Sequence, residues 1–141
     1  MYDIIVVGGG PAGLTAALYS VRAGKSVLVL EKANYGGQMA LSPRIENYLG
    51  FLEISGYDLS EMIFKQVEAA GAELLDEEVL SISEKDNIKT VKTDMDEYQS
   101  KAVIIATGMR HKTLGVENEN EYSGNGISYC AACDGAFYKD K

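Results

Sequence analysis

Two cysteines, the only ones in the 141-residue chain, lie three positions apart as Cys130-Ala131-Ala132-Cys133. This spacing is used by zinc sites, by thioredoxin-type domains and by redox dithiols. A structural zinc site takes four ligands, and the chain adds only one histidine, His111, to the two cysteines, so we expect no metal. The interpretation that we favour is a dithiol that exchanges two electrons with a second redox group.

Asp134 follows the second cysteine directly. Its carboxyl group can give and take the proton that thiolate chemistry requires, which makes it a candidate acid-base partner. A cap on a helix or turn is the alternative role for an aspartate in this place. The candidate catalytic residues are therefore Cys130, Cys133 and Asp134.

A second candidate site is the run GGGPAG at residues 8–13, which fits the dinucleotide-binding pattern G-x-G-x-x-G. Gly8 permits the tight turn, Gly10 lets a pyrophosphate approach the backbone, and Gly13 lets the helix pack closely on the sheet. The amides at the start of that helix then bind phosphate. The pattern alone does not distinguish FAD from NAD.

Glu31 completes this pattern, because it stands at the end of the next predicted strand. A carboxylate there accepts hydrogen bonds from the ribose hydroxyls of a dinucleotide. Its negative charge would repel a 2′-phosphate, which disfavours NADP at this site.

The elements that must position these residues begin with two continuous apolar runs, DIIVV at 3–7 and SVLVL at 26–30. Such runs are typical of strands buried on both faces. Between them Pro11 suits the first position of a helix, which we expect over residues 12–23 before Gly24. A strand, a helix and a strand within about 30 residues predict a βαβ unit with parallel strands.

The following sequence predicts an irregular segment over residues 34–56 and an amphipathic helix over 57–70. Strands are expected over 74–83, 87–93 and 97–107, the second and third joined as in an antiparallel meander. The predicted fold class is therefore α/β, a Rossmann-like βαβ domain with a small antiparallel β-meander.

Composition excludes some kinds of partner. The formal charge of −8 and a pI near 4.6 argue against nucleic acid, which needs clustered basic residues. The longest apolar runs, IIVV and AVIIA, are far shorter than the roughly 20 residues of a membrane span, so no membrane contact is expected. The first residues lack the features of a signal peptide, and a C-x-x-C pair without one favours the cytoplasm.

Five motifs together carry a family resemblance: GGGPAG at 8–13, GGQM at 36–39, IENYLGF at 45–51, VIIATG at 103–108 and SYCAACDG at 128–135. They occur in this order in bacterial-type, low-molecular-weight thioredoxin reductases, which the whole chain resembles. SYCAACDG is the most specific of the five, whereas many flavoproteins share the first and fourth.

This resemblance implies FAD at the N-terminal site and a set of residues that would bind it. The residues implied are Gly8, Gly10, Pro11, Ala12 and Gly13 at the pyrophosphate, Glu31 and Lys32 at the adenosine, Val79 near the adenine, Gly37, Gln38 and Asn47 on the flavin side, and Ala106, Thr107 and Gly108 beneath the cofactor. For Val79 and Thr107, ordinary strand packing is the alternative.

The resemblance also implies an activity, the FAD-dependent reduction of thioredoxin or a similar protein disulfide. Cys133 would receive electrons from the flavin, Cys130 would attack the disulfide of the substrate, and Asp134 would serve as their acid-base partner. The flavoprotein component of alkyl hydroperoxide reductase and a ferredoxin-dependent relative are alternatives of the same kind. A non-catalytic FAD-binding electron-transfer module is an alternative of a different class.

By the same resemblance, residues 1–114 would be the N-terminal part of an FAD-binding domain and 115–126 a linker. Residues 127–141 would begin an NADPH domain, so the fold would be incomplete at the C-terminus. We therefore do not expect this chain alone to oxidise NADPH. The full-length protein would be a cytoplasmic homodimer that uses NADPH.

Overall fold

The computed structural model describes residues 1–123, 125–131, 135 and 139. The chain folds into two compact units, Met1–Gly108 and Met109–Lys141. Two of the predicted catalytic residues, Cys133 and Asp134, lie outside the described residues.

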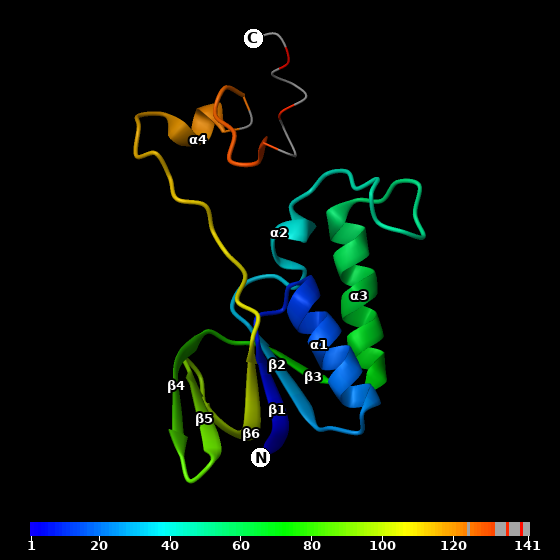
Figure 1. The fold of residues 1–141 in the computed structure, drawn as a ribbon, viewed down its shortest axis with the longest axis vertical. Helices are drawn as coiled ribbons and strands as arrows, with labels where there is room; N and C mark the ends of the chain where they lie inside the picture. Colours follow the sequence, from blue (N-terminus) through cyan, green and yellow to red (C-terminus); the bar gives the residue numbers. More distant parts are fainter. Residues whose placement is uncertain (124, 132–134, 136–138, 140–141) are drawn as a thin grey trace. The chain divides into compact units, whose positions relative to one another are not determined.

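The first unit begins with the predicted βαβ arrangement of β1 (Tyr2–Val7), α1 (Pro11–Arg22) and β2 (Val27–Glu31). The two strands are parallel, with Ile4 opposite Val27 in the register. Pro11 starts the helix, as predicted, because a residue in that position has no intrahelical partner for an N–H group. The loops that follow β1 and β2 therefore lie at the same edge of the sheet (Figure 1).

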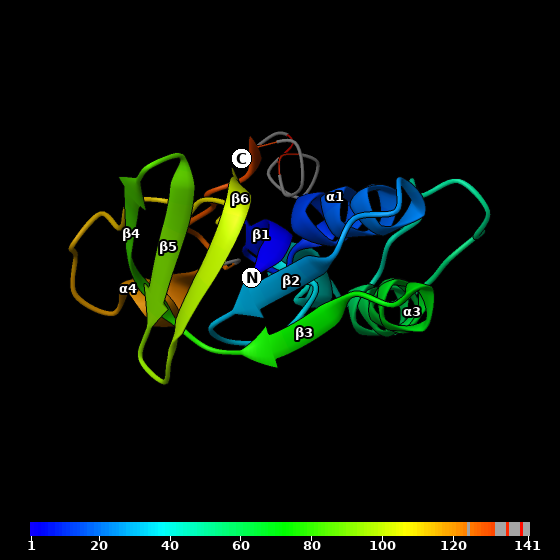
Figure 2. The same cartoon turned by 90° about the horizontal axis from the view of Figure 1, so that it is seen from below.

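All six strands form one sheet in the order β3-β2-β1-β6-β5-β4 (Figure 2). The strands β3 (Glu73–Asp76) and β6 (Glu97–Ile105) run parallel to β2 and β1. The strands β4 (Val79–Lys85) and β5 (Ile88–Thr93) extend the sheet beyond β6 in antiparallel fashion. The predicted α/β class with an antiparallel meander is thus confirmed.

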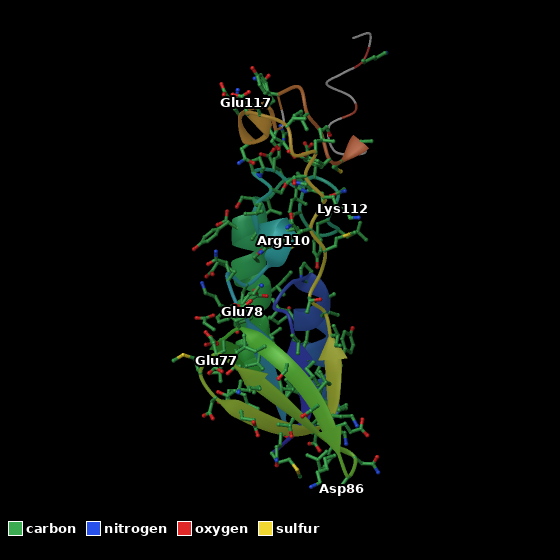
Figure 3. All side chains as sticks on the ribbon, turned by 90° about the vertical axis from the view of Figure 1, so that its left-hand side faces the viewer. Glu77, Glu78, Asp86, Arg110, Lys112 and Glu117 are labelled. Atoms are coloured by element: carbon green, nitrogen blue, oxygen red, sulfur yellow. The ribbon has the colours of Figure 1, made fainter. Side chains whose placement is uncertain are left out.

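The prediction of a single strand over residues 74–83 is wrong, because the chain forms two separate strands there, β3 and β4, interrupted at Glu77 and Glu78 (Figure 3). The Glu77 carboxylate accepts hydrogen bonds from Thr93 Oγ1 at 2.7 Å and Tyr98 OH at 2.8 Å. The Glu78 N–H donates to Asp94 Oδ1 at 2.9 Å. These bonds stand in place of ladder bonds, so β3 joins the parallel strands while β4 joins the meander.

The helix α3 (Gly56–Ala70) packs beside α1 on one face of the sheet (Figures 1 and 2). It begins after Ser55, whose Oγ accepts the Asp58 N–H at 3.0 Å, and ends at Gly71 in the left-handed conformation. An N-cap of this kind stabilises a helix by about 1 kcal/mol. The segment predicted to be irregular also contains a short helix, α2 (Gly37–Ala40).

Apolar side chains fill both faces of the parallel strands. On the helical face, Val6 and Val29 pack in one buried cluster with Leu14 of α1 and Val67 of α3. On the opposite face the strand residues pack with Val91 of β5; they are Ile5, Val7, Leu28 and Leu30. Both faces being covered explains the continuous apolar runs, since each fully buried side chain of this size contributes about 1.5–3 kcal/mol.

The described part of the second unit includes the helical turn α4 (Glu119–Tyr122) and a parallel bridge between Ser123 and Ile127. This turn lies within residues 115–126, for which the sequence suggested a linker. In the described part of the chain, no helix is long and apolar enough to cross a membrane.

Candidate functional site

The glycine loop begins where β1 ends, and Gly8 turns the chain out of the sheet. Its N–H donates to the Leu30 carbonyl at 2.8 Å, and its φ of +107° lies in a region that side chains disfavour. A Cβ added to Gly8 would collide with the carbonyl oxygen of Ala106, which itself follows β6. The loop after β1 and the loop after β6 are therefore in contact at this edge.

The N-terminus of α1 is arranged as an anion-binding end. Gly10 is its N-cap residue, and within the described residues no side chain caps the helix there. A Cβ added to Gly10 would meet nothing within 4 Å, whereas one added to Gly13 would collide with the Gly8 carbonyl. The first amides of the helix have no intrahelical partners, so the open side at Gly10 gives a negatively charged group access to them.

Glu31 lies beside this loop, half-buried at the end of β2. Its Oε2 accepts the Gly9 N–H at 2.6 Å, and its Oε1 accepts the Ala33 N–H at 3.0 Å. Each carboxylate oxygen can accept a second hydrogen bond. Glu31 thus positions the loop and keeps acceptor capacity for the ribose hydroxyls proposed from the sequence.

The segment before α2 closes the other side of the loop. The Gly36 N–H donates to the Gly9 carbonyl at 2.8 Å, and a Cβ added to Gly37 would lie 3.4 Å from the Cα of Gly10. Two stretches that the sequence assigned to one binding site, the glycine loop and GGQM, therefore lie side by side.

For the other predicted cofactor-binding residues described below, the structure shows either contacts elsewhere or an exposed side chain. Lys32 is exposed and forms an ion pair with Glu78 at 2.9 Å. Val79 packs against the apolar cluster of Ile5 and Leu28, which is the strand-packing role considered as its alternative. Four further residues, Gln38, Asn47, Thr107 and Gly108, are exposed.

In the second unit, Cys130 and the residue before it contact residues that precede them in the sequence. The Cys130 N–H donates to Ser128 Oγ at 3.2 Å, and its sulfur is not a free thiol. The Tyr129 ring stacks on His111 with a centroid distance of 3.8 Å and an angle of 15°. The only histidine of the chain therefore contacts the residue next to the predicted redox pair.

Glu119 holds the loop that leads to α4. Its Oε1 accepts the Leu114 N–H at 2.9 Å and its Oε2 accepts the Gly115 N–H at 2.7 Å, although only 8% of the residue is exposed. A buried carboxylate that accepts two backbone N–H groups fixes a turn strongly, because each such bond is charge-assisted.

Sequence reasoning missed Tyr35 and Glu119. Burial and the nearby charges of Asp76 and Glu31 raise the pKa of the Tyr35 hydroxyl well above its usual value, and this group donates to the Leu75 carbonyl at 3.0 Å. A lone tyrosine or glutamate carries no motif, so only the folded chain reveals what these side chains contact.

Residues 2–141 match the family model for pyridine nucleotide-disulphide oxidoreductases. The chain belongs to this family. It is 45% identical over 141 residues to a thioredoxin reductase from Bacillus subtilis, covering all of this chain and 45% of the relative. Among solved structures, it is similar to a thioredoxin reductase from Streptococcus pyogenes, at a TM-score of 0.86 and 44% identity over 97% of this chain and 45% of that one. A thioredoxin reductase from Lactococcus lactis gives a TM-score of 0.81 and 42% identity with the same coverages.

These similarities confirm the resemblance inferred from the motifs. The chain spans about 45% of the length of the relatives it matches. The family implies a flavin cofactor. The residues present fit such a group, because the uncapped start of α1, the open side at Gly10 and the acceptor capacity of Glu31 suit the pyrophosphate and ribose of a flavin dinucleotide.

Proposed function

We propose that the chain is the flavin- and dithiol-bearing part of a thioredoxin-disulfide reductase. The observation that carries the proposal is the open, uncapped start of α1, where Gly8–Gly13, Glu31 and Ala106 are in contact, in a chain that also holds a C-x-x-C pair. Family membership and similarity over the whole chain support it. The domain limits 1–114, 115–126 and 127–141 belong to the same proposal.

In this proposal FAD is the flavin, and the glycine loop and the start of α1 hold its pyrophosphate. Glu31 and Lys32 lie at its adenosine, with Val79 near the adenine. The flavin end is lined by the start of α2 and by two loops, namely by Gly37, Gln38, Asn47 and Ala106–Gly108. When bound, FAD supplies a two-electron carrier matched to the two electrons of a disulfide.

The cysteine pair carries out thiol–disulfide exchange. The Cys130 thiolate attacks one sulfur of the substrate disulfide, forming a mixed disulfide and releasing the other substrate sulfur as a thiolate. The Cys133 thiolate then attacks the Cys130 sulfur, which closes the pair and releases the second substrate thiolate. Asp134 gives and takes the protons of these thiols. The substrate is reduced by two electrons and the pair is oxidised by two.

The substrate proposed is thioredoxin or a thioredoxin-like protein. NADPH is the electron source proposed for the whole protein, which would act as a cytoplasmic homodimer. A reducing compartment suits this chemistry, because thiols that cycle through a disulfide persist there.

The test mixes the FAD-loaded, photoreduced chain with oxidised thioredoxin in the absence of oxygen and counts the thiols formed on thioredoxin. We expect thiols with the native pair and only a trapped mixed disulfide with Cys133→Ser. The Cys130→Ser variant is the matched control and should form neither. Thioredoxin reduction by Cys130→Ser at the native rate would overturn the assignment, and flavin bleaching without new thiols would instead support a non-catalytic electron-transfer module.

A further inference from the structure

We propose that Tyr35 is a positioning residue of the glycine loop, and that its ring holds Gly9 so that the loop has its phosphate-binding shape before the cofactor arrives. This inference rests on the proposed FAD site and adds to it a residue that lies outside the dinucleotide-binding pattern. The pattern G-x-G-x-x-G leaves position 9 open to any residue. In this chain the structure restricts it.

Gly9 is held from three sides. Its N–H donates to Glu31 Oε2 at 2.6 Å, and its carbonyl accepts the Gly36 N–H at 2.8 Å. A Cβ added to Gly9 would lie 2.5 Å from Cδ1 and 2.7 Å from Cε1 of Tyr35, and 3.0 Å from the Cβ of Glu31. The Tyr35 ring therefore occupies the space that a side chain at position 9 would need.

The Tyr35 ring is itself fixed in place. Its hydroxyl donates to the Leu75 carbonyl of β3 at 3.0 Å, and its ring packs against Phe64 of α3 with a centroid distance of 4.9 Å. It also packs against the apolar cluster that includes Leu14 of α1. These contacts fix the position of the ring, so the ring edge that lies beside Gly9 cannot easily move away.

The fixed ring of Tyr35 should affect ligand binding, because it helps to set the shape of the glycine loop. Both peptide groups of Gly9 are hydrogen-bonded to neighbours, so the direction of the next amides, at the open side by Gly10, is set by these bonds and by the ring. A loop held in its bound shape loses less conformational freedom when phosphate binds. Loss of the Tyr35 ring should therefore weaken binding of any ligand that uses these amides.

The first experiment measures FAD affinity of the purified chain by fluorescence titration. Tyr35→Ala should raise the dissociation constant about tenfold or more, whereas Tyr35→Phe, which keeps the ring, should change it by less than about threefold. Tyr57→Ala is the matched control, because Tyr57 lies on α3 and is 65% exposed. Equal affinities for Tyr35→Ala and the native chain would overturn the inference.

The second experiment tests the contact itself and does not depend on Tyr35→Ala folding. Gly9→Ala keeps Tyr35 and all its core contacts, yet it should weaken FAD binding at least as much, because its methyl group meets the ring. The double variant Gly9→Ala with Tyr35→Ala should then bind FAD more tightly than Gly9→Ala alone, since removing the ring makes room. Losses that simply add would contradict the contact.

Amide hydrogen exchange of the cofactor-free chain separates failure of this inference from failure of the proposed function. Tyr35→Ala should speed exchange of the Gly9, Gly10, Ala12 and Gly13 amides relative to those of β1 and β2, and Tyr35→Phe should not. Unchanged exchange at 9–13 would overturn the role of Tyr35. A native chain that binds no FAD would contradict the proposed function, while the exchange result would still decide the inference.

Discussion

Two glutamates hold loops in the two units of this chain, and they do so in the same way. Glu31 in the first unit accepts the N–H groups of Gly9 and Ala33, and Glu119 in the second accepts those of Leu114 and Gly115. Glu31 lies half-buried beside an open helix N-terminus, whereas Glu119 is almost wholly buried. The same kind of bond therefore supports the proposed cofactor site in one unit and a chain turn in the other.

This difference shows that surroundings decide the role of a carboxylate. The bonds that Glu31 accepts leave it room for further donors beside Gly10, where the structure is open. Glu119 is enclosed, so its bonds serve the fold of its own unit. Changes to the two residues should affect different measurements, and four predictions follow from the contrast between the units.

Glu31→Ala should have the largest effect. It removes the acceptor for the Gly9 N–H and the proposed acceptor for ribose hydroxyls, and a lost hydrogen bond to a charged group costs about 1.5–3 kcal/mol. We expect the FAD dissociation constant to rise about 10- to 100-fold in a fluorescence titration. Glu68→Ala, at an exposed position on α3, is the control, and an unchanged constant for Glu31→Ala would remove Glu31 from the site.

Glu119→Ala should leave FAD affinity unchanged and loosen the second unit. The N–H groups of Leu114 and Gly115 would lose their charged acceptor, and a hydrogen bond to a charged group contributes about 1.5–3 kcal/mol. Faster amide exchange at these two residues measures the effect, with Glu121→Ala on the same helical turn as the exposed control. A drop in FAD affinity equal to that of Glu31→Ala would erase the contrast between the two residues.

His111→Ala should have a smaller effect, confined to the segment that carries the cysteines. The stack of His111 on Tyr129 is worth about 0.5–1.5 kcal/mol, and its loss should let the reduced Cys130 thiol react severalfold faster with a small disulfide reagent. His111→Phe keeps an aromatic ring and should react like the native chain. If it reacts like His111→Ala, stacking is not the cause.

The smallest effect expected concerns the far end of the first unit and appears only at high pH. Burial and the hydrogen bond to Glu73 raise the pKa of the Tyr2 hydroxyl to about 12. The folded state therefore favours the protonated phenol, so its stabilising contribution is complete below about pH 10, the unfolded value, and is lost as the pH rises from there to about 12. Urea unfolding midpoints across this range should fall less steeply for Tyr2→Phe than for the native chain.

The sequence predicted those parts of the fold that depend on residues close together in the chain. The βαβ unit followed from two apolar runs and from Pro11 before a helical pattern, all local signals. The break between β3 and β4 could not be predicted, because it depends on Glu77 meeting Thr93 and Tyr98 from other strands. A run of strand-forming residues does not show which residues of other strands its side chains will contact.

The same distinction between local and long-range contacts separates the site residues that the sequence predicted from those that it did not. Its glycines and Glu31 could be found because their spacing is set by one strand–helix–strand connection. Tyr35 could not, since its contacts with Gly9, Phe64 and Leu75 join three separate elements. The C-x-x-C spacing alone left zinc and redox chemistry open, and the resemblance depended most strongly on the longer motif SYCAACDG because many flavoproteins share the glycine loop.

The central claim is that one chain couples a flavin to a dithiol, and a reductive titration tests it most directly. The FAD-loaded chain, titrated with dithionite in the absence of oxygen, should take up four electrons per flavin, two for the flavin and two for the disulfide. The Cys130→Ser and Cys133→Ser double variant should take up two. Uptake of two electrons by the native chain would contradict the account.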